Sequence, residues 1–319
     1  MARGSPPAPR ATRGRTPHTM SRMGDVLAGI HATWEFESDS VLIRFERGIR
    51  TPKLFQALGE RRVPHEALAL VTLTPGKRGT VVLHAIPRPG ADPLMEAAAG
   101  QLRDGSDPYR LVLPAEREML AEYYADELRA LLGPEAALPA EKFLVAAPQA
   151  PLHFKAYDGK ASFDGSRVSF RWFWTGASSA KWKAGDQSFP VQELHGVEWR
   201  SPDVFDGYLR LLRRGGGLGA PAAQPAQADQ DPAAVVFGLG YGPVHESLPF
   251  AAAVLGAVRT GSAAPDHLVP AEPVPVPVAA RRDPADIAER IRHLGDLREA
   301  GLVTDEEFTA KKAELLAEL

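Results

Sequence analysis

Residues 41–45 read VLIRF and residues 168–172 read VSFRW, and this pair of matching strand-like segments decides the fold. Each is preceded by another strand-like segment and a short polar turn, with TWEF at 33–36 and KASF at 160–163. Runs rich in β-branched and aromatic residues, separated by turn residues, predict antiparallel hairpins. The chain therefore contains two copies of one β-rich unit, about 126 residues apart.

The repeat keeps its register to the end of both copies, because the offset stays between 124 and 128 residues. Each copy closes with apolar residues at helical spacing, which predicts one amphipathic helix at 115–132 and another at 246–258. The remaining matched pairs are VPHEAL at 63–68 with FPVQEL at 189–194, GTVVL at 79–83 with GYLRL at 207–211, and DPYRLVL at 107–113 with DPAAVVF at 231–237. Frequent turns without βαβ alternation favour an α+β fold, in which each copy is a small sandwich or open barrel capped by its C-terminal helix.

Changes in composition divide the chain into segments. Five arginines and no acid precede residue 24, which predicts a basic arm, unless Met20 or Met23 is the true initiator. Between its last two strands the first copy has Asp92 and Pro93, an N-cap and first residue of a short helix, whereas the second has a Gly- and Ala-rich insert. We expect a disordered basic arm at 1–23, repeats at 24–135 and 143–262 with a disordered insert at about 213–232, a Pro-rich linker at 263–283 and a helical hairpin at 284–319. Whether the repeats pack together stays open.

Composition also limits the function. The 319 residues include no cysteine, which excludes disulfides, thiolate metal sites and a cysteine nucleophile. No two of the nine histidines lie three or four residues apart, and the GLGYG run at 238–242 favours a turn over a dinucleotide loop. The net charge of −3 provides no overall positive potential that would attract nucleic acid. No apolar run approaches the ~20 residues that span a bilayer. We therefore expect no cofactor, no metal, no nucleic acid and no catalysis, with an unrecognised hydrolase as the weakest alternative.

One loop of the first repeat is basic, and the second repeat carries lysines in the matching place. Loops on a rigid scaffold commonly hold binding sites, although a solvated loop tip is the simpler interpretation. The candidate anion- or partner-binding residues are Arg47, Arg50, Lys53, Arg61, Arg62, Lys181 and Lys183. The second repeat is also rich in aromatic residues, and the tryptophans at 172, 174, 182 and 199 either belong to the core or mark an exposed interface.

The C-terminal segment has the pattern of two short helices. Asp283 and Pro284 begin the first, Gly301 ends it, and Thr304 with Glu307 forms the capping box of the second. A hairpin of this size cannot bury a sufficient core alone, so its apolar face must pack on a second chain, on the rest of this chain or on another protein. That oligomerisation or docking face comprises Ile287, Ile291, Leu294, Leu297, Phe308, Leu315 and Leu316.

Two family resemblances follow from these motifs. Residues 292–316, RHLGDLREAGLVTDEEFTAKKAELL, resemble the short C-terminal (SHOCT) domain, which implies oligomerisation or partner docking. Residues 24–262 resemble a tandem of the bacterial domain-of-unknown-function family numbered 4429, through LFQALG at 54–59, VP at 63–64, ADPL at 91–94, DPYRL at 107–111 and VEW at 197–199. That resemblance implies a pleckstrin-homology-like fold, a bent seven-stranded sheet plugged by a helix, whose loops receive anionic headgroups or peptides.

These observations predict a non-catalytic cytoplasmic scaffold that binds a protein partner or itself, made multivalent by the hairpin. The alternative is peripheral binding to an anionic membrane, such as the inner membrane face, through the basic loops.

Overall fold

The computed structural model describes residues 25–204, 206–214, 227–238 and 240–262, together with Asp305, Thr309, Lys312 and Ala313, which are helical. Internal contacts divide the chain into residues 1–264, which hold both repeats, and residues 265–319. The expected basic arm, most of the insert, the linker and every residue of the predicted hairpin face lie outside the described residues.

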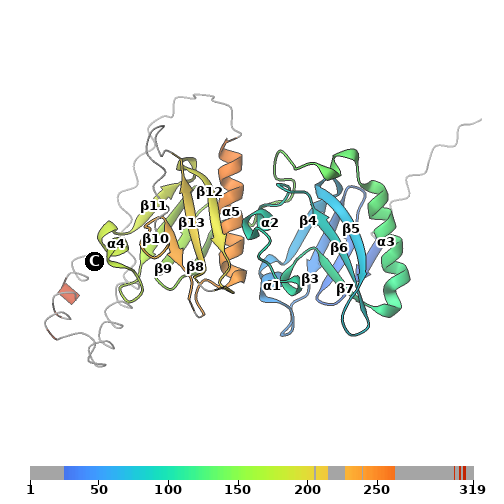
Figure 1. Cartoon of the computed structure of the whole chain (residues 1–319), viewed down its shortest axis with the longest axis horizontal. Helices are drawn as coiled ribbons and strands as arrows, with labels where there is room; N and C mark the ends of the chain where they lie inside the picture. Colours follow the sequence, from blue (N-terminus) through green and yellow to red (C-terminus); the bar gives the residue numbers. More distant parts are fainter. Residues whose placement is uncertain are drawn as a thin grey trace, which may run out of the picture. The chain divides into compact units, whose positions relative to one another are not determined.

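The first repeat consists of two antiparallel sheets and a C-terminal helix (Figure 1). One sheet has the order β1-β2-β3-β4 and the other the order β5-β6-β7. Its strands are β1 (Asp25–Ala28), β2 (Ala32–Phe36), β3 (Ser40–Phe45), β4 (Glu60–Pro64), β5 (Leu68–Pro75), β6 (Thr80–Pro87) and β7 (Arg110–Pro114), and its helices are α1 (Lys53–Leu58), α2 (Pro93–Ala98) and α3 (Glu118–Leu131).

The second repeat has the same arrangement, with one sheet ordered β11-β10-β9-β8 and the other β12-β13-β14. Its strands are β8 (Leu152–Lys155), β9 (Gly159–Phe163), β10 (Arg167–Trp172), β11 (Gln187–Pro190), β12 (Leu194–Arg200), β13 (Tyr208–Arg213) and β14 (Ala234–Val236), and its helices are α4 (Ser179–Ala184) and α5 (Val244–Ser262). The mixed class with antiparallel sheets, the internal repeat and the two closing helices are confirmed. The short helices α1 and α4 were not predicted, and they occupy what the sequence predicted to be a loop.

Each four-stranded sheet meets its three-stranded partner through a backbone hydrogen bond at the first turn of the repeat. The amide of Ile30 donates to the carbonyl of Val112 at 2.7 Å, and the amide of Tyr157 donates to the carbonyl of Val236 at 2.9 Å. Alternation then directs every second side chain inward, as at Trp34, which is fully buried. The closing helix covers the apolar interior of each repeat.

The two closing helices differ in how much of their surface is buried. In α3 the buried residues are Ala121, Tyr124, Ala125 and Leu128, which form one face. In α5 all five residues from Phe250 to Val254 are buried. Since successive residues of an α-helix point about 100° apart, α5 must be covered on opposite sides.

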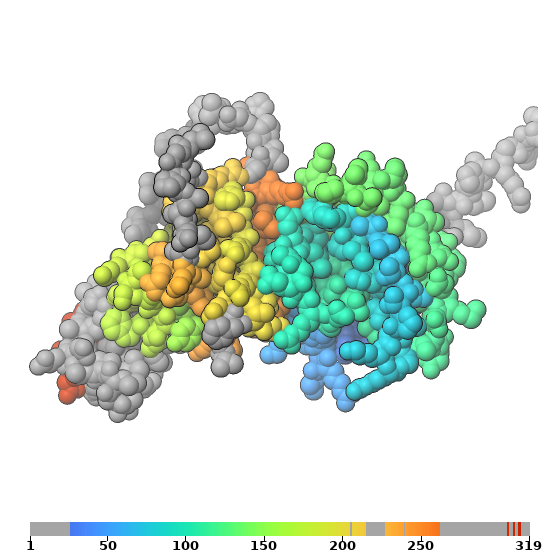
Figure 2. Space-filling model, in the orientation of Figure 1, coloured from blue at the N-terminus to red at the C-terminus, as the bar shows by residue number. Residues whose placement is uncertain are grey.

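The second cover of α5 comes from the first repeat. Leu54 of α1 and Leu94, Ala97 and Ala98 of α2 belong to the same apolar cluster as α5 and the sheets of the second repeat. Figure 2 shows the atoms of α2 (teal) against those of α5 (orange). The core of the second repeat thus extends onto α1 and α2 of the first repeat, whose own core is a separate cluster, so the two repeats pack together, which answers the question that the sequence left open.

Polar contacts align this interface. The side-chain amide of Gln101 donates to the carbonyl of Trp199 at 2.9 Å, and its oxygen accepts from the amide of Ser201 at 2.9 Å. Arg259 of α5 lies 3.3 Å from Glu96 of α2. The side-chain amide of Gln101 both donates to and accepts from backbone groups of the second repeat. These directional bonds fix how the two repeats are aligned with each other.

Helix α2 is held in place by a buried carboxylate at its start. Asp92 accepts from the amide of Leu94 at 2.9 Å, from Arg61 at 2.6 Å and from the hydroxyl of Tyr109 at 2.7 Å. Burial alone would lower the pKa of Arg61, but Asp92 and Tyr109 raise it, and burial raises the pKa of Tyr109 well above its ordinary value. The predicted N-cap Asp92, with Pro93 following it, is confirmed.

Asp92→Asn should destabilise the tandem strongly, because the amide leaves the guanidinium of Arg61 buried without a counter-charge. The expected loss in the free energy of unfolding is about 3 to 5 kcal/mol, measured by urea denaturation. Glu37→Gln, which removes the partner of the exposed Arg62, is the matched control and should cost about 1 kcal/mol or less. Equal effects of the two substitutions would contradict this role for Asp92.

Candidate functional site

The loops at one end of each repeat are fixed by equivalent backbone contacts. In the first repeat the amide of Glu46 donates to the carbonyl of His31 at 3.0 Å. In the second repeat the amide of Phe173 donates to the carbonyl of Asp158 at 2.9 Å. These bonds join the first turn of the repeat to the segment before α1 or α4. Side chains on these loops are therefore presented from a rigid frame.

In the first repeat this end carries an exposed basic loop, formed by Arg47, Ile49, Arg50 and Lys53. All four side chains are exposed, and Ile49 has no protection from solvent, with a relative exposure of 106%. The side chain of Gln56 donates to two carbonyl oxygens within the loop, those of residues 48 and 51, at 3.0 and 2.9 Å. The hydrogen bonds from Gln56 thus fix the conformation of the basic loop, and Ile49 gives it an apolar tip.

The remaining predicted binding residues are distributed differently from the expectation. Arg62 is exposed but forms an ion pair with Glu37 and donates to Ser40 at 3.0 Å. Lys183 is exposed on α4. The structure does not bring these two side chains into the basic loop.

Two predicted binding residues, Arg61 and Lys181, are buried and cannot belong to an exposed site. Arg61 points inward from β4 to Asp92, where it holds α2. Lys181 is completely buried, forms an ion pair with Asp158 at 2.5 Å and lies 4.9 Å from the ring centre of Trp172. The expectation was wrong for both because each has a buried aspartate as its partner.

The repeat itself explains why Lys181 is buried. At the equivalent place in the first repeat Phe55 stacks on Phe45, with ring centres 4.6 Å apart. In the second repeat Lys181 and Trp172 replace these two rings, so a cation–π contact takes the place of a stacked pair. Aligning the two copies more closely would have identified Lys181 as a core position.

The buried Lys181–Asp158 pair also ties three segments together. The second carboxylate oxygen of Asp158 accepts from the amide of Val236 at 2.9 Å, so the pair joins the β8–β9 turn, α4 and β14. Burial raises the pKa of Asp158 and lowers the pKa of Lys181, against the mutual attraction of the two charges. The pair supports the loops at this end of the second repeat.

Those loops, together with α4, expose an aromatic cluster, which we define as Tyr157, Trp174, Trp182 and Tyr241. Trp174 and Tyr157 are 53% and 52% exposed, and the other two rings are also exposed. The rings form two edge-on pairs, with centres 5.2 Å apart for Trp174 and Trp182 and 6.4 Å apart for Tyr157 and Tyr241. The sequence left open whether the tryptophans are core or interface, and the structure divides them, since Trp172 and Trp199 are buried.

The expected turn at 238–242 carries one member of this cluster. The amide of Tyr241 donates to the carbonyl of Gly238 at 3.0 Å, which closes the turn. A side chain at Gly238 would contact the ring of Tyr157, so glycine allows this turn to approach the β8–β9 turn closely.

Comparison with family models decides the classification. The model described as Domain of unknown function (DUF4429) matches residues 34–129 and 161–255. The chain belongs to the DUF4429 family. The model of the Short C-terminal domain (SHOCT) matches residues 289–316. No curated protein matches the chain.

The two DUF4429 repeats as described contain no group of three or more histidine, aspartate or glutamate residues placed to hold a metal ion. Among the helices in the described part of the chain, none is both long and apolar enough to cross a membrane.

Proposed function

We propose that this DUF4429 protein is a non-catalytic scaffold whose aromatic cluster binds a protein partner. The observation that carries the proposal is the exposure of Tyr157, Trp174, Trp182 and Tyr241 at one end of a rigid repeat. Exposed apolar patches of this kind mark interaction sites, and tryptophan and tyrosine supply much of the binding energy at protein interfaces.

The fold supports a binding role of this kind. Each repeat combines a four-stranded and a three-stranded antiparallel sheet with one closing helix, and we propose that it is a pleckstrin-homology-like module. Such a frame holds loops rigidly, so little conformational entropy is lost when they bind.

The buried charged groups support a non-catalytic role. Arg61 and Asp92 hold α2, and Lys181 and Asp158 hold the loops below the aromatic cluster. Each of these side chains is buried and paired with an opposite charge. Perturbed charged groups often mark catalytic sites, but structural pairs perturb pKa values as well, and we assign these four residues to structure.

Replacing Trp182 by photoreactive p-benzoylphenylalanine should produce a covalent adduct with the partner on irradiation of cells that make the protein naturally. Tyr123, an exposed ring on α3, is the matched control position and should give no such adduct. Adducts are read on denaturing gels and by mass spectrometry. Identical adduct patterns at the two positions, or none at Trp182, would count against the proposal.

The SHOCT segment supports a second part of the proposal, which is self-association of the chain. Linking binding units in this way raises avidity without a new contact. Light scattering measures the mass in solution, and dividing it by the mass of one chain gives the number of subunits. That number should be larger for the full chain than for a chain ending at Ala280. If both are monomeric, the segment does not assemble the protein.

A second candidate function is binding to an anionic membrane surface, favoured by the basic loop. Three exposed cations lie close to the solvent-exposed Ile49 in the sequence, so the loop combines charge attraction with an apolar side chain that can enter the interface.

The triple variant Arg47→Gln, Arg50→Gln and Lys53→Gln should abolish co-sedimentation with vesicles that contain phosphatidylserine. Binding of the unaltered chain should also weaken as salt rises, because the attraction is screened within ~8 Å at physiological ionic strength. Glu46→Gln in the same loop is the control and should not weaken binding. Unchanged co-sedimentation of the triple variant would exclude this function.

A further inference from the structure

The outer face of the second repeat's four-stranded sheet carries three cations side by side. Lys155 of β8 is the register partner of Lys160 on β9, and Lys160 is the partner of Arg171 on β10. We call Lys155, Lys160 and Arg171 the basic row. Like charges directly opposite each other on neighbouring strands destabilise a sheet, so the basic row requires an explanation.

Within the described residues the two lysines have no compensating partner. Lys155 is exposed and Lys160 is half-buried, and the side chain of neither forms a hydrogen bond or ion pair with any described side chain. Arg171 lies 3.6 Å from Asp186. Two uncompensated ammonium groups therefore stand on adjacent strands.

The first repeat shows that the fold does not need this arrangement. The equivalent row there is Ala28, Thr33 and Arg44, which are register partners in the same order. Its single cation pairs with two acids, Glu35 and Glu60. The second repeat has thus placed lysines where the first has alanine and threonine.

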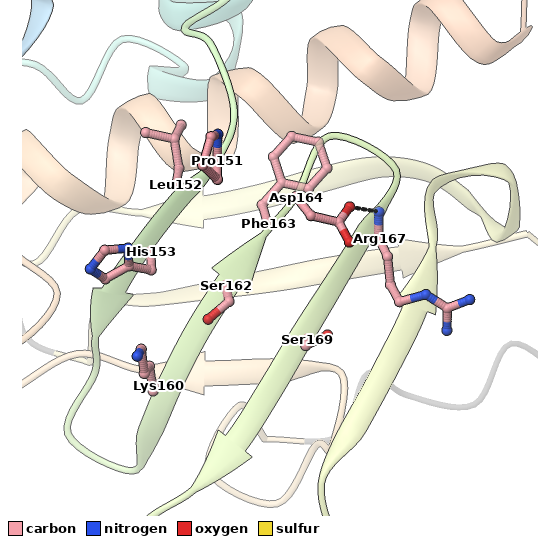
Figure 3. Close-up of a pocket in the computed structure, with 9 residues that line it drawn as sticks. All are labelled: Pro151, Leu152, His153, Lys160, Ser162, Phe163, Asp164, Arg167 and Ser169. Carbon is pink, nitrogen blue, oxygen red and sulfur yellow. Dashed lines mark hydrogen bonds between the residues drawn. The ribbon is translucent and has the colours of Figure 1, made fainter. Parts of the chain in front are cut away.

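Hydroxyl groups lie on the same face beside the basic row. Ser162 of β9 is the register partner of Ser169 on β10 and of His153 on β8. Together with Lys160 these residues line a shallow depression of about 200 Å³, in which Figure 3 shows their side chains on neighbouring strands. This volume is smaller than the roughly 300–1,000 Å³ typical of sites for drug-sized ligands.

The acid at the other end of the depression is already engaged. Asp164 accepts from the amide of Ser166 at 2.8 Å and from the amide of Arg167 at 2.8 Å, and Figure 3 draws the second of these bonds. These hydrogen bonds lower the pKa of the Asp164 carboxyl. Arg167 in turn donates to Ser188 at 3.0 Å. The carboxylate thus belongs to the β9–β10 turn and does not pair with the two lysines.

We propose that this face binds a phosphomonoester or pyrophosphate group, either free or on a lipid headgroup. Lys155 and Lys160 supply the charge for a dianion, and Ser162 and Ser169 supply hydroxyl donors to its oxygens. Lysine suits such a ligand because its ammonium acts as a point charge with three donors. The site differs from the aromatic cluster and from the basic loop in both residues and ligand.

Pyrophosphate should raise the melting temperature of the full chain at constant ionic strength, measured by scanning calorimetry. The double variant Lys155→Ala and Lys160→Thr, which copies the first repeat, should show no pyrophosphate-dependent rise. Without pyrophosphate it should melt at the same or a higher temperature, because the repulsion is relieved. A purely structural role for the lysines would instead lower that temperature.

The basic-loop triple variant is the control for location, and its response to pyrophosphate should be unchanged. Loss of the response in that variant, retention of it in the double variant, or no response in the unaltered chain would each overturn the proposal. These results do not depend on the photocrosslinking at Trp182, so either proposal can fail alone.

Vesicles distinguish the two sources of the phosphate. Lysine-dependent binding to phosphatidylcholine vesicles containing phosphatidic acid, but not phosphatidylserine, would identify a lipid headgroup. A pyrophosphate response without vesicle binding would identify a soluble ligand. Equal lysine-dependent binding to both anionic lipids would show a general attraction to negative charge and overturn the proposal.

Discussion

The buried carboxylate of Asp92 is the contact on which the tandem arrangement depends. It accepts from Arg61 on β4, from Tyr109 just before β7 and from the first turn of α2. Moving a charged group out of water costs free energy, and pairing with an opposite charge and hydrogen bonding offset that cost. The pairing fixes α2 against both sheets of the first repeat. The apolar side of α2 is then available to cover α5, and the two repeats become one folded unit.

The two repeats use one frame for different purposes. The first provides the surface that covers α5, through α1 and α2, and has a compensated charge pattern on its outer sheet face. In the second repeat, Trp172 and Lys181 stand in place of the Phe45–Phe55 stack, and Lys181 pairs with Asp158. The segments that the Lys181–Asp158 pair supports expose other aromatic rings. The added lysines of the basic row belong to the second repeat as well. Duplication thus separates a supporting copy from a copy with more candidate binding groups.

Prediction from sequence succeeded where neighbours along the chain decide the structure. The strand pairs around Trp34 and Phe170, the closing helices and the Asp92 cap all follow from local periodicity or from a local hydrogen bond. Helices α1 and α4 were missed because six residues give less than two helical turns, too few for a clear period, and neither begins with the Asp-Pro signal that marks the equally short α2. Charged residues are mostly exposed in proteins, and this expectation placed Arg61 and Lys181 on the surface.

The sequence by itself determined that there are two β-rich copies, where most of their strands lie and which helix closes each. Those features depend on the alternation of side chains over a few residues. Tertiary structure decided that the second repeat's core extends onto α1 and α2 of the first, that Arg61 and Lys181 are buried, and that Trp174 is exposed while Trp172 is not. It also decided that Lys155, Lys160 and Arg171 stand in one row. Burial and charge environment depend on groups far apart in the chain, such as Asp92 for Arg61, which local patterns do not report.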